Sequence, residues 1–131
     1  MRISDATMEK LLLRSGVATV EQISVLKEES LNSKRPLQDI AIQNEIIDEK
    51  TLTKAFAEYV QVPYIELDVS EIKYDILNKI PEHIARQYNA ILFAIDENGV
   101  NQLAVDDPDD IQAINFIEKE IGTNTKIYIT P

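Results

Sequence analysis

The amino-acid sequence predicts an α+β fold, with two tandem pairs of short helices packed on a small mixed sheet. Apolar residues recur at helical spacing as far as residue 62, and shorter strand-like runs follow. Cap and turn residues separate these segments. With 131 residues, 44% of them apolar, the chain can bury a substantial core. We therefore expect a helical subdomain over residues 1–62 and a small α/β subdomain over residues 63–131.

The first helix pair is predicted at the start of the chain. One helix begins near Asp5 and ends at Gly16, the residue type favoured just after a helix C-terminus. Thr19 and Gln22 have the spacing of a capping box and open a second helix. The side chains expected to point inward are Met8, Leu11 and Leu12 in the first helix and Val20, Ile23 and Leu26 in the second.

The second helix pair follows the same plan. Pro36 suits a first helical turn, Asn44 can take the left-handed closing position, and Asp48 can cap the next helix. The expected inward side chains are Leu37, Ile40 and Ala41, and then Leu52, Ala55, Phe56 and Tyr59.

The two pairs align with each other when Met8 is laid on Leu37. At this constant offset the aligned positions are Met8/Leu37, Leu11/Ile40, Leu12/Ala41, Val17/Ile46, Thr19/Asp48 and Ile23/Leu52. One helix pair cannot bury its own apolar faces, whereas two pairs can pack against each other. The sequence therefore predicts a duplicated helix pair.

Strands are predicted after Val62. The run PYIEL at 63–67 has a strand pattern, and two short helices are expected over YDILNKI and over residues 81–88. Strands at 90–96 and 100–106 flank Gly99, which supplies the positive φ of a hairpin turn. KIYIT forms the last strand. The order β, α, β, β, α, β is typical of a sheet with helices on one face.

The helix before the last strand is expected to begin at Pro108, capped by Asp107, and to end at Gly122. Its expected inward side chains are Ile111, Ile114 and Ile117. The run DDPDD at 106–110 could suggest a metal site, but it lacks the glycine and distal glutamate of a calcium loop. Carboxylates are also stabilised at a helix N-terminus, so we interpret the run as capping.

The net charge of −10 is unevenly placed. Residues 1–62 carry 8 basic and 10 acidic side chains, whereas residues 63–131 carry 5 and 13. An acidic field repels nucleic acid and anionic lipid, so a protein with a basic patch is the favoured partner. The alternative is that acidity serves solubility alone. The first apolar run, at residues 11–13, is too short for a signal peptide or membrane span, and we expect a cytoplasmic protein.

No residue set in the sequence points to catalysis. Cysteine is absent, and the single histidine, His83, has no second histidine or cysteine to share a metal and is expected to be exposed. Phosphate-binding loops and nucleophile elbows are absent, and the chain has three glycines. We assign no catalytic residue, metal ligand or cofactor, and expect an adaptor or regulatory module rather than an enzyme.

Three ordered runs resemble a known family. PLQDIAIQNEIIDEKTLTKAFAEYVQVPYIEL, IPEHIARQYNAI and LAVDDPDDIQAI resemble the N-terminal domain of type II secretion and type IV pilus assembly ATPases, the MshEN-like domain of the GspE and PilB family. The resemblance covers essentially the whole chain. It implies an ATPase motor in the same protein after Pro131, and docking on the cytoplasmic domain of an inner-membrane platform protein. The chain would then lie in the cytoplasm, peripheral to the membrane, without hydrolysing ATP.

The resemblance also implies a second function. Some family members bind cyclic di-GMP on the helix pairs through "RLG…L…G.I" motifs, in which glycine admits the ligand and arginine supplies charge and a stacking plane. The residues of this chain that match or lie near the motif are Arg14, Gly16, Arg35 and Leu37, and a receptor function predicts that these four residues lie along one groove.

The chain departs from this motif at informative positions. In the first copy Thr7, Met8 and Glu9 replace RLG. In the second copy Gln38 and Glu45 replace both glycines. The carboxylates of Glu9 and Glu45 would face an anionic ligand, which weakens the case for cyclic di-GMP relative to protein docking.

Overall fold

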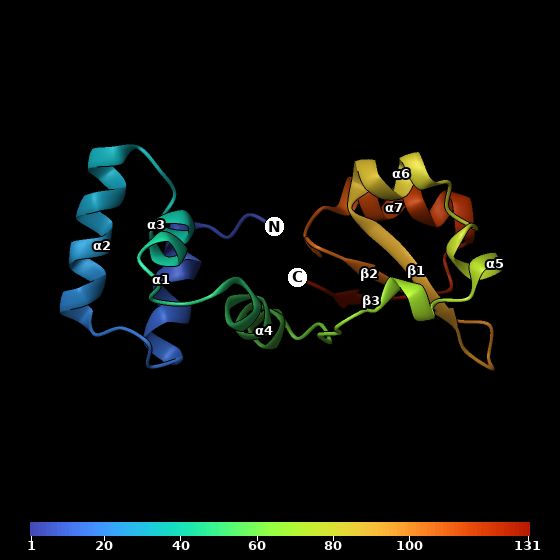
Figure 1. Ribbon diagram of the computed structural model, residues 1–131, viewed down its shortest axis with the longest axis horizontal. Helices are drawn as coiled ribbons and strands as arrows, with labels where there is room; N and C mark the ends of the chain where they lie inside the picture. The colour runs from blue at the N-terminus through green and yellow to red at the C-terminus, as the bar shows by residue number, and fades with distance from the viewer. The chain divides into compact units, whose positions relative to one another are not determined.

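The computed structural model describes residues 1–131 and confirms the predicted α+β class, with seven α-helices and a three-stranded sheet. The chain divides into two compact units, Met1–Val60 and Gln61–Pro131. Figure 1 labels their elements. None of the helices has the length and hydropathy that a membrane span needs.

The first unit consists of four helices. They are α1 (Asp5–Arg14), α2 (Val20–Ser33), α3 (Leu37–Gln43) and α4 (Glu49–Val60). Thr19 and Gln22 form the predicted capping box of α2, and Asp48 Oδ1 accepts the Thr51 amide at 2.7 Å at the start of α4.

The duplication is confirmed in the burial pattern of this unit. When the two helix pairs are aligned at the predicted offset, a buried residue of the first pair aligns with a buried residue of the second at five positions. These aligned residues are Met8/Leu37, Leu11/Ile40, Leu12/Ala41, Ala18/Ile47 and Ile23/Leu52. These side chains form the core that neither pair could form by itself. The buried side chain of Gln38 joins α3 to the start of the chain by two hydrogen bonds. It accepts from the Ile3 amide at 2.9 Å and donates to the Met1 carbonyl at 3.1 Å.

Three predictions for this unit were wrong. Val20 was expected inward and is 68% exposed, and Tyr59 lies at the surface of α4. The left-handed closing position belongs to Glu45, with φ of 58°, whereas Asn44 has a φ of −84°. The 3.6-residue period predicts which side of a helix is buried. It does not predict how wide the buried side is, because this width depends on how the neighbouring helices pack.

The second unit carries the sheet. Its elements are a 3₁₀ turn η1 (Val69–Glu71), α5 (Tyr74–Leu77), α6 (Glu82–Tyr88), β1 (Ala90–Ile95), β2 (Asn101–Val105), α7 (Ile111–Ile121) and β3 (Thr125–Ile129). The sheet order is β1-β2-β3. β1 and β2 form the predicted hairpin with a bulge between Leu92 and Ala94, and α7 connects β2 to the parallel strand β3.

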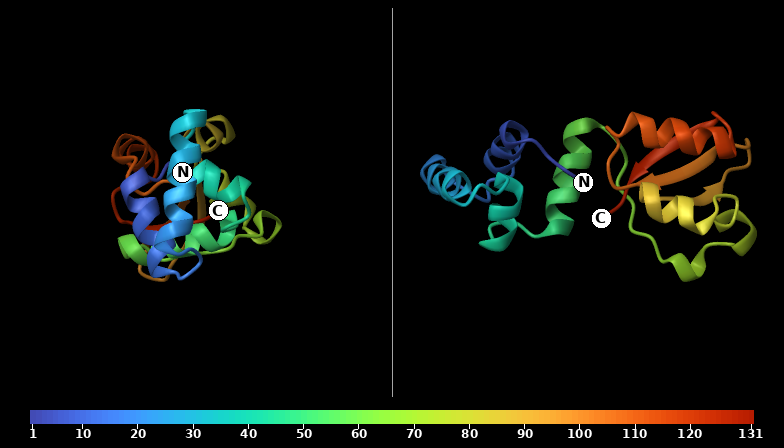
Figure 2. Two further views of the ribbon diagram at one scale, coloured as in Figure 1. Left: turned by 90° about the vertical axis from the view of Figure 1, so that its left-hand side faces the viewer. Right: turned by 90° about the horizontal axis from the view of Figure 1, so that it is seen from above.

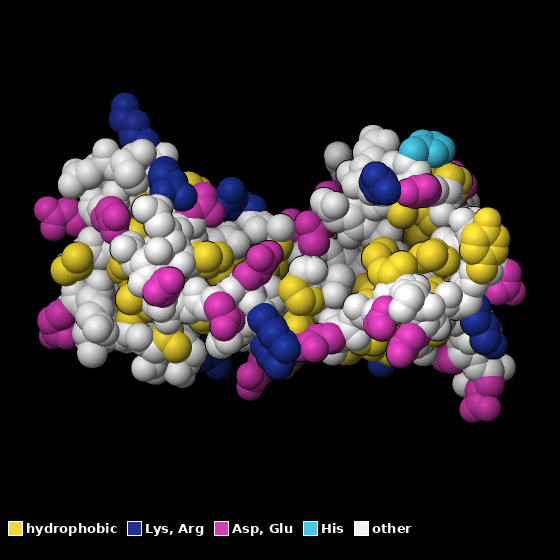
Figure 3. Space-filling view, in the orientation of Figure 1, with side chains coloured by type: hydrophobic (Ala, Val, Ile, Leu, Met, Phe, Trp, Pro, Cys, Tyr) yellow, Lys and Arg dark blue, Asp and Glu magenta, His cyan; other side chains and the backbone are white.

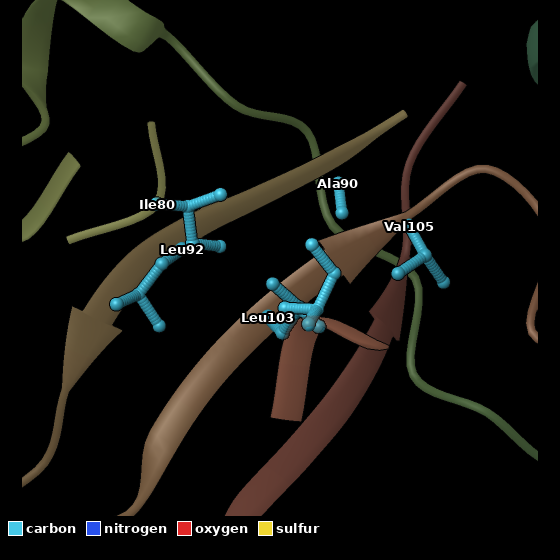
Figure 4. Close-up of a cluster of buried hydrophobic side chains, with 6 residues drawn as sticks. Ile80, Ala90, Leu92, Leu103 and Val105 are labelled. Atoms are coloured by element: carbon cyan, nitrogen blue, oxygen red, sulfur yellow. The ribbon is translucent and has the colours of Figure 1, made fainter. Parts of the chain in front are cut away.

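One hydrophobic cluster holds this unit together. It comprises Ile80, Ala90, Leu92, Leu103, Val105 and Ile117 (Figure 4). Ile84 and Tyr88 of α6 and Ile114 of α7 pack against it. Both helices therefore cover the same face of the sheet, as Figures 1 and 2 show.

The strand predicted at 63–67 is reduced to a single parallel bridge between Tyr64 and Ile129. The Ile129 amide donates to the Pro63 carbonyl, and the Ile65 amide donates to the Ile129 carbonyl, both at 2.8 Å. After Ile65 the chain turns away toward η1. The residue pattern at 63–67 is typical of a strand, but only Tyr64 forms a β-bridge with another segment.

The start of α7 was also predicted wrongly. The helix begins at Ile111, and its cap is Asp110, whose carboxylate accepts the Ala113 amide at 3.1 Å. Asp107 instead closes a local turn by accepting the Asp109 amide. This later start leaves Ile111 64% exposed and turns Ala113 and Ile117 inward.

Candidate functional site

The first unit has two helix elbows, here meaning the turns between the two helices of each pair. Arg14 and Gly16 lie at the first elbow, whereas Arg35 and Leu37 lie at the start of the second pair. At the first elbow, α1 is followed by its C-cap residue Ser15, whose amide and hydroxyl both donate to the Leu11 carbonyl. Gly16 follows with φ of 72° and donates to the Leu13 carbonyl. A Cβ on Gly16 would meet no atom within 4 Å, so the backbone angle rather than crowding favours glycine there.

Arg14 lies in the last turn of α1, next to this elbow. Its guanidinium carbon is 5.7 Å from the centre of the Tyr59 ring of α4. An arginine over an aromatic face is held by a cation–π attraction and keeps its donors available to solvent. Arg14 and Gly16 are therefore brought together, and Tyr59 joins them.

The second elbow has the same backbone with different residues. Asn44 and Glu45 repeat the hydrogen bonds of Ser15 and Gly16, since the Asn44 amide donates to Ile40 and the Glu45 amide to Ile42. Glu45 adopts the left-handed conformation without being glycine. Asn44 Nδ2 donates to Glu29 of α2 at 2.8 Å, so this elbow is tied to the neighbouring helix.

Arg35 lies between α2 and α3. Its backbone is fixed by Ser30, whose hydroxyl donates to the Arg35 carbonyl at 2.5 Å. Its guanidinium donates to the side-chain carbonyl of Gln43. In the repeat alignment that lays Met8 on Leu37, Gln43 falls on Arg14. Arg35 therefore binds Gln43, the residue of the second helix pair that aligns with Arg14 of the first.

Leu37 occupies the first position of α3 and is buried in the core. Its amide donates to Asp5 Oδ1 at 3.0 Å. Asp5 begins α1 and Arg14 ends it, a separation of about 13 Å at roughly 1.5 Å per residue. The structure thus places Leu37 at one end of α1 and Arg14 with Gly16 at the other, and the four-residue groove stays a prediction.

Sequence reasoning missed Asp5, Gln43 and Tyr59 as partners of the candidate residues. The repeat alignment could have suggested Gln43, because it pairs this residue with Arg14. The apolar period of its helix marked Tyr59 as an inward residue, but no local pattern could have related it to Arg14, because Tyr59 lies three helices further along the chain.

Two carboxylates of the first unit are engaged in ion pairs. Glu9 lies 3.4 Å from Lys27 of α2, and Arg2 lies 3.3 Å from Asp39. His83 is exposed on α6, and no group of three or more acidic, histidine or cysteine side chains lies close enough to hold a metal ion.

Comparison with known proteins identifies the family. The profile of the MshEN domain matches residues 60–131, more than half of the chain. The chain belongs to the MshEN domain family. Over 131 residues this MshEN chain is also 24% identical to the type IV pilus assembly ATPase PilB of Thermus thermophilus. The alignment covers 99% of the chain and 15% of that relative, so the chain spans a small part of its length.

Solved structures share the fold of the MshEN chain. The structure of MshE with cdg superposes with a TM-score of 0.74 at 23% identity, covering 93% of this chain and 88% of that one. The N-terminal domain of XpsE gives a TM-score of 0.59 at 16% identity, covering 99% and 90%. Identities this low show a common fold and leave the ligands and partners of the MshEN chain to be argued separately.

Proposed function

We propose that this chain is the N-terminal docking and regulatory domain of a type II secretion or type IV pilus assembly ATPase. The observation that carries the proposal is the MshEN match, supported by the alignment of the whole chain with a small part of a pilus assembly ATPase. In this proposal the motor lies elsewhere in the same protein. The MshEN region binds a partner and does not itself hydrolyse ATP.

The partner in this proposal is the cytoplasmic domain of an inner-membrane platform protein. Such a partner would hold the ATPase in the cytoplasm at the membrane without any insertion of this chain. The second unit supports a protein partner with a basic surface, because residues 63–131 carry 13 acidic and 5 basic side chains. The same field disfavours nucleic acid.

Calorimetry tests the docking proposal. The chain is titrated with the purified cytoplasmic domain of the platform protein from the same gene cluster, at about 50 mM and about 300 mM salt. We expect binding that weakens at the higher salt, since charge contributes to the encounter. Lack of binding at the lower salt would contradict the proposal.

A second candidate function is reception of cyclic di-GMP, the nucleotide abbreviated cdg in the description of the MshE structure. The first elbow favours it, because Gly16 leaves the backbone open and Arg14 presents a guanidinium on an aromatic ring. The second elbow favours it less, since Glu45 adds a carboxylate where the first copy has glycine.

Melting curves separate this candidate from docking. If the chain is a receptor, cyclic di-GMP at about 1 mM raises the Tm, and Arg14→Ala removes the shift because it deletes charge and stacking plane together. GTP at the same concentration is the control for non-specific nucleotide binding. An unchanged Tm at millimolar cyclic di-GMP rejects the receptor function and leaves docking unaffected.

A further inference from the structure

The helix α2 has an outward face that nothing in the first unit explains. The helix packs through Ile23, Leu26 and Ser30, which are its buried residues. At roughly 100° per residue, the exposed side carries Val20, Glu21, Val25, Glu28 and Leu31, spread over about 140° of the helix surface and here called the α2 outer face.

Three apolar side chains lie exposed on the α2 outer face. Val20 is 68%, Val25 65% and Leu31 80% exposed. Valine is a poor helix former because its branched Cβ loses rotamer freedom in a helix. Helix propensity therefore does not account for the two valines, and core packing accounts for none of the three residues, whereas burial against a partner would account for all of them.

The α2 outer face is acidic as well as apolar. Glu21 and Glu28 lie among the three apolar residues, and both are exposed. The one basic residue of α2, Lys27, lies at the edge of this face, one turn before Leu31, and pairs with Glu9 of α1 at 3.4 Å. Figure 3 shows hydrophobic and acidic side chains following each other along the edge formed by α2.

The dimensions of this face indicate the shape of its partner. The stretch from Val20 to Leu31 measures about 16 Å along a straight helix. An amphipathic helix of about four turns covers such a length, with its apolar residues at i, i+3, i+4 and i+7.

We propose that the α2 outer face binds an amphipathic helix of a partner protein. Apolar side chains of that helix cover Val20, Val25 and Leu31, and its Lys or Arg side chains lie beside Glu21 and Glu28. This inference deepens the docking function proposed above and rests on it for the identity of the partner.

The first test uses a defined probe, a synthetic amphipathic helix of about 18 residues built from Leu and Lys, with Leu at i, i+3, i+4 and i+7. NMR titration of the full chain is expected to show shift changes centred on α2. The double variant V25K/L31K is expected to bind at least about tenfold more weakly, because it replaces apolar contacts with like charge. Lysine favours helix more than valine does, so this variant should keep its fold, which its melting curve checks.

The matched control is V69K/Y74K, which adds the same charge at two exposed apolar positions of the second unit, 47% and 82% exposed. It is expected to bind the peptide as the wild type does. The inference is overturned if both double variants lose affinity equally, if the shift changes centre outside α2, or if the peptide does not bind.

The second test repeats the comparison with the cytoplasmic domain of the platform protein. Loss of binding in V25K/L31K alone supports the inference. Equal binding by wild type and V25K/L31K overturns the α2 surface while the docking function stands. If the peptide binds on α2 and the platform domain fails to bind even the wild type, the surface is supported and the docking function is contradicted.

Discussion

Gly16 and Glu45 occupy equivalent positions in the two helix elbows, with φ of 72° and 58°. A residue with a Cβ is strained in this conformation because the Cβ approaches the backbone carbonyl, at a cost of about 1–2 kcal/mol. The second elbow keeps its shape because the core around Leu37, Ile40 and Ile47 holds both ends of the turn. Glu45 is thus held in a strained conformation.

Glu45→Gly is expected to stabilise the chain. Removing the Cβ relieves the strain, and the greater freedom of glycine in the unfolded chain offsets part of the gain, leaving about 1 kcal/mol. Urea denaturation followed by circular dichroism measures the free energy of unfolding.

Two controls separate strain from charge in this prediction. Glu45→Ala removes the carboxylate and keeps the Cβ, so it should change stability much less than glycine does. Gly16→Ala should destabilise the chain by about 1 kcal/mol, since it introduces the same strain into the first elbow. Equal effects of glycine and alanine at residue 45 would show that charge rather than backbone strain is responsible.

The cap of α4 predicts a pH dependence. The backbone amide of Thr51, and next its hydroxyl, donate to Asp48 and lower the pKa of this carboxyl below 3.8. Because the folded pKa is the lower one, ionised Asp48 stabilises the fold above the unfolded pKa, and this contribution disappears as the pH falls through the folded value. Asp48→Ala should lower the Tm at pH 7, and the difference from wild type should shrink below pH 3.8.

Asp48→Asn is the control for this pH dependence, because asparagine can cap the helix without titrating. Its Tm should vary less than that of wild type between pH 5 and pH 3. A difference between wild type and Asp48→Ala that stays constant down to pH 2 would contradict the assignment.

The helix α7 shows how packing selects one face of an element. Ile111 and Ile117 are both isoleucines of this helix, but the first is 64% exposed and the second is fully buried in the sheet cluster. Aspartates stand on both sides of Pro108, and either could cap a helix. The start at Ile111 is the one that turns Ala113 and Ile117 toward the strands.

The two isoleucines provide a matched pair of substitutions. Ile117→Ala should cost about 3 kcal/mol through lost burial and the cavity left in the cluster. Ile111→Ala should change the free energy of unfolding by less than about 0.5 kcal/mol, as exposed positions do. Thermal and urea unfolding measure both. Similar losses for the two variants would mean that Ile111 is buried, as the apolar pattern alone suggested.

At the element scale, the sequence predicted the features that depend on neighbouring residues. The capping box of Thr19, the cap at Asp48 and the hairpin at Gly99 are local, and all three are present. The repeat of the helix pair was also predictable, because the apolar residues of the two pairs align at one constant offset. The strand expected at 63–67 was wrong, because the pairing of Tyr64 depends on Ile129, which lies near the opposite end of the second unit's sequence.

The candidate site was less predictable than the fold. Leu37 was predicted as an inward core residue from the apolar pattern and as a ligand contact from the family resemblance, and the structure confirms that it is buried. The partners of Arg14 and Arg35 are set by how α1, α3 and α4 pack, so no single-residue signal marks them. The exposure of Val20 follows from α2 having neighbours on one side.

Considered as a whole molecule, the chain carries excess negative charge. Its net charge is −10, and the ion pairs Arg2–Asp39, Lys27–Glu9 and Arg86–Glu82 join exposed or half-exposed side chains. Such pairs contribute little to stability, whereas repulsion among the remaining carboxylates favours expansion of the chain.

Added salt should therefore stabilise the chain. Raising sodium chloride from about 20 mM to about 300 mM shortens the screening length and weakens the repulsion, so the Tm should rise by a few degrees. Differential scanning calorimetry measures the change, with the uncharged osmolyte sucrose as a control for excluded-solute effects. A falling Tm would show that attractive ion pairs outweigh the repulsion.

The bridge at Ile129 determines how the second unit would respond to tension. Pro63 and Ile65 enter the unit beside the strand by which the chain leaves it, and the two segments run in the same direction. Pulling residue 61 and residue 131 apart would load these two hydrogen bonds together in shear, where both must break at once, rather than one after another as in peeling. Tension applied between the two ends of this unit is therefore carried by these two hydrogen bonds, while its helices and hairpin stay unstretched.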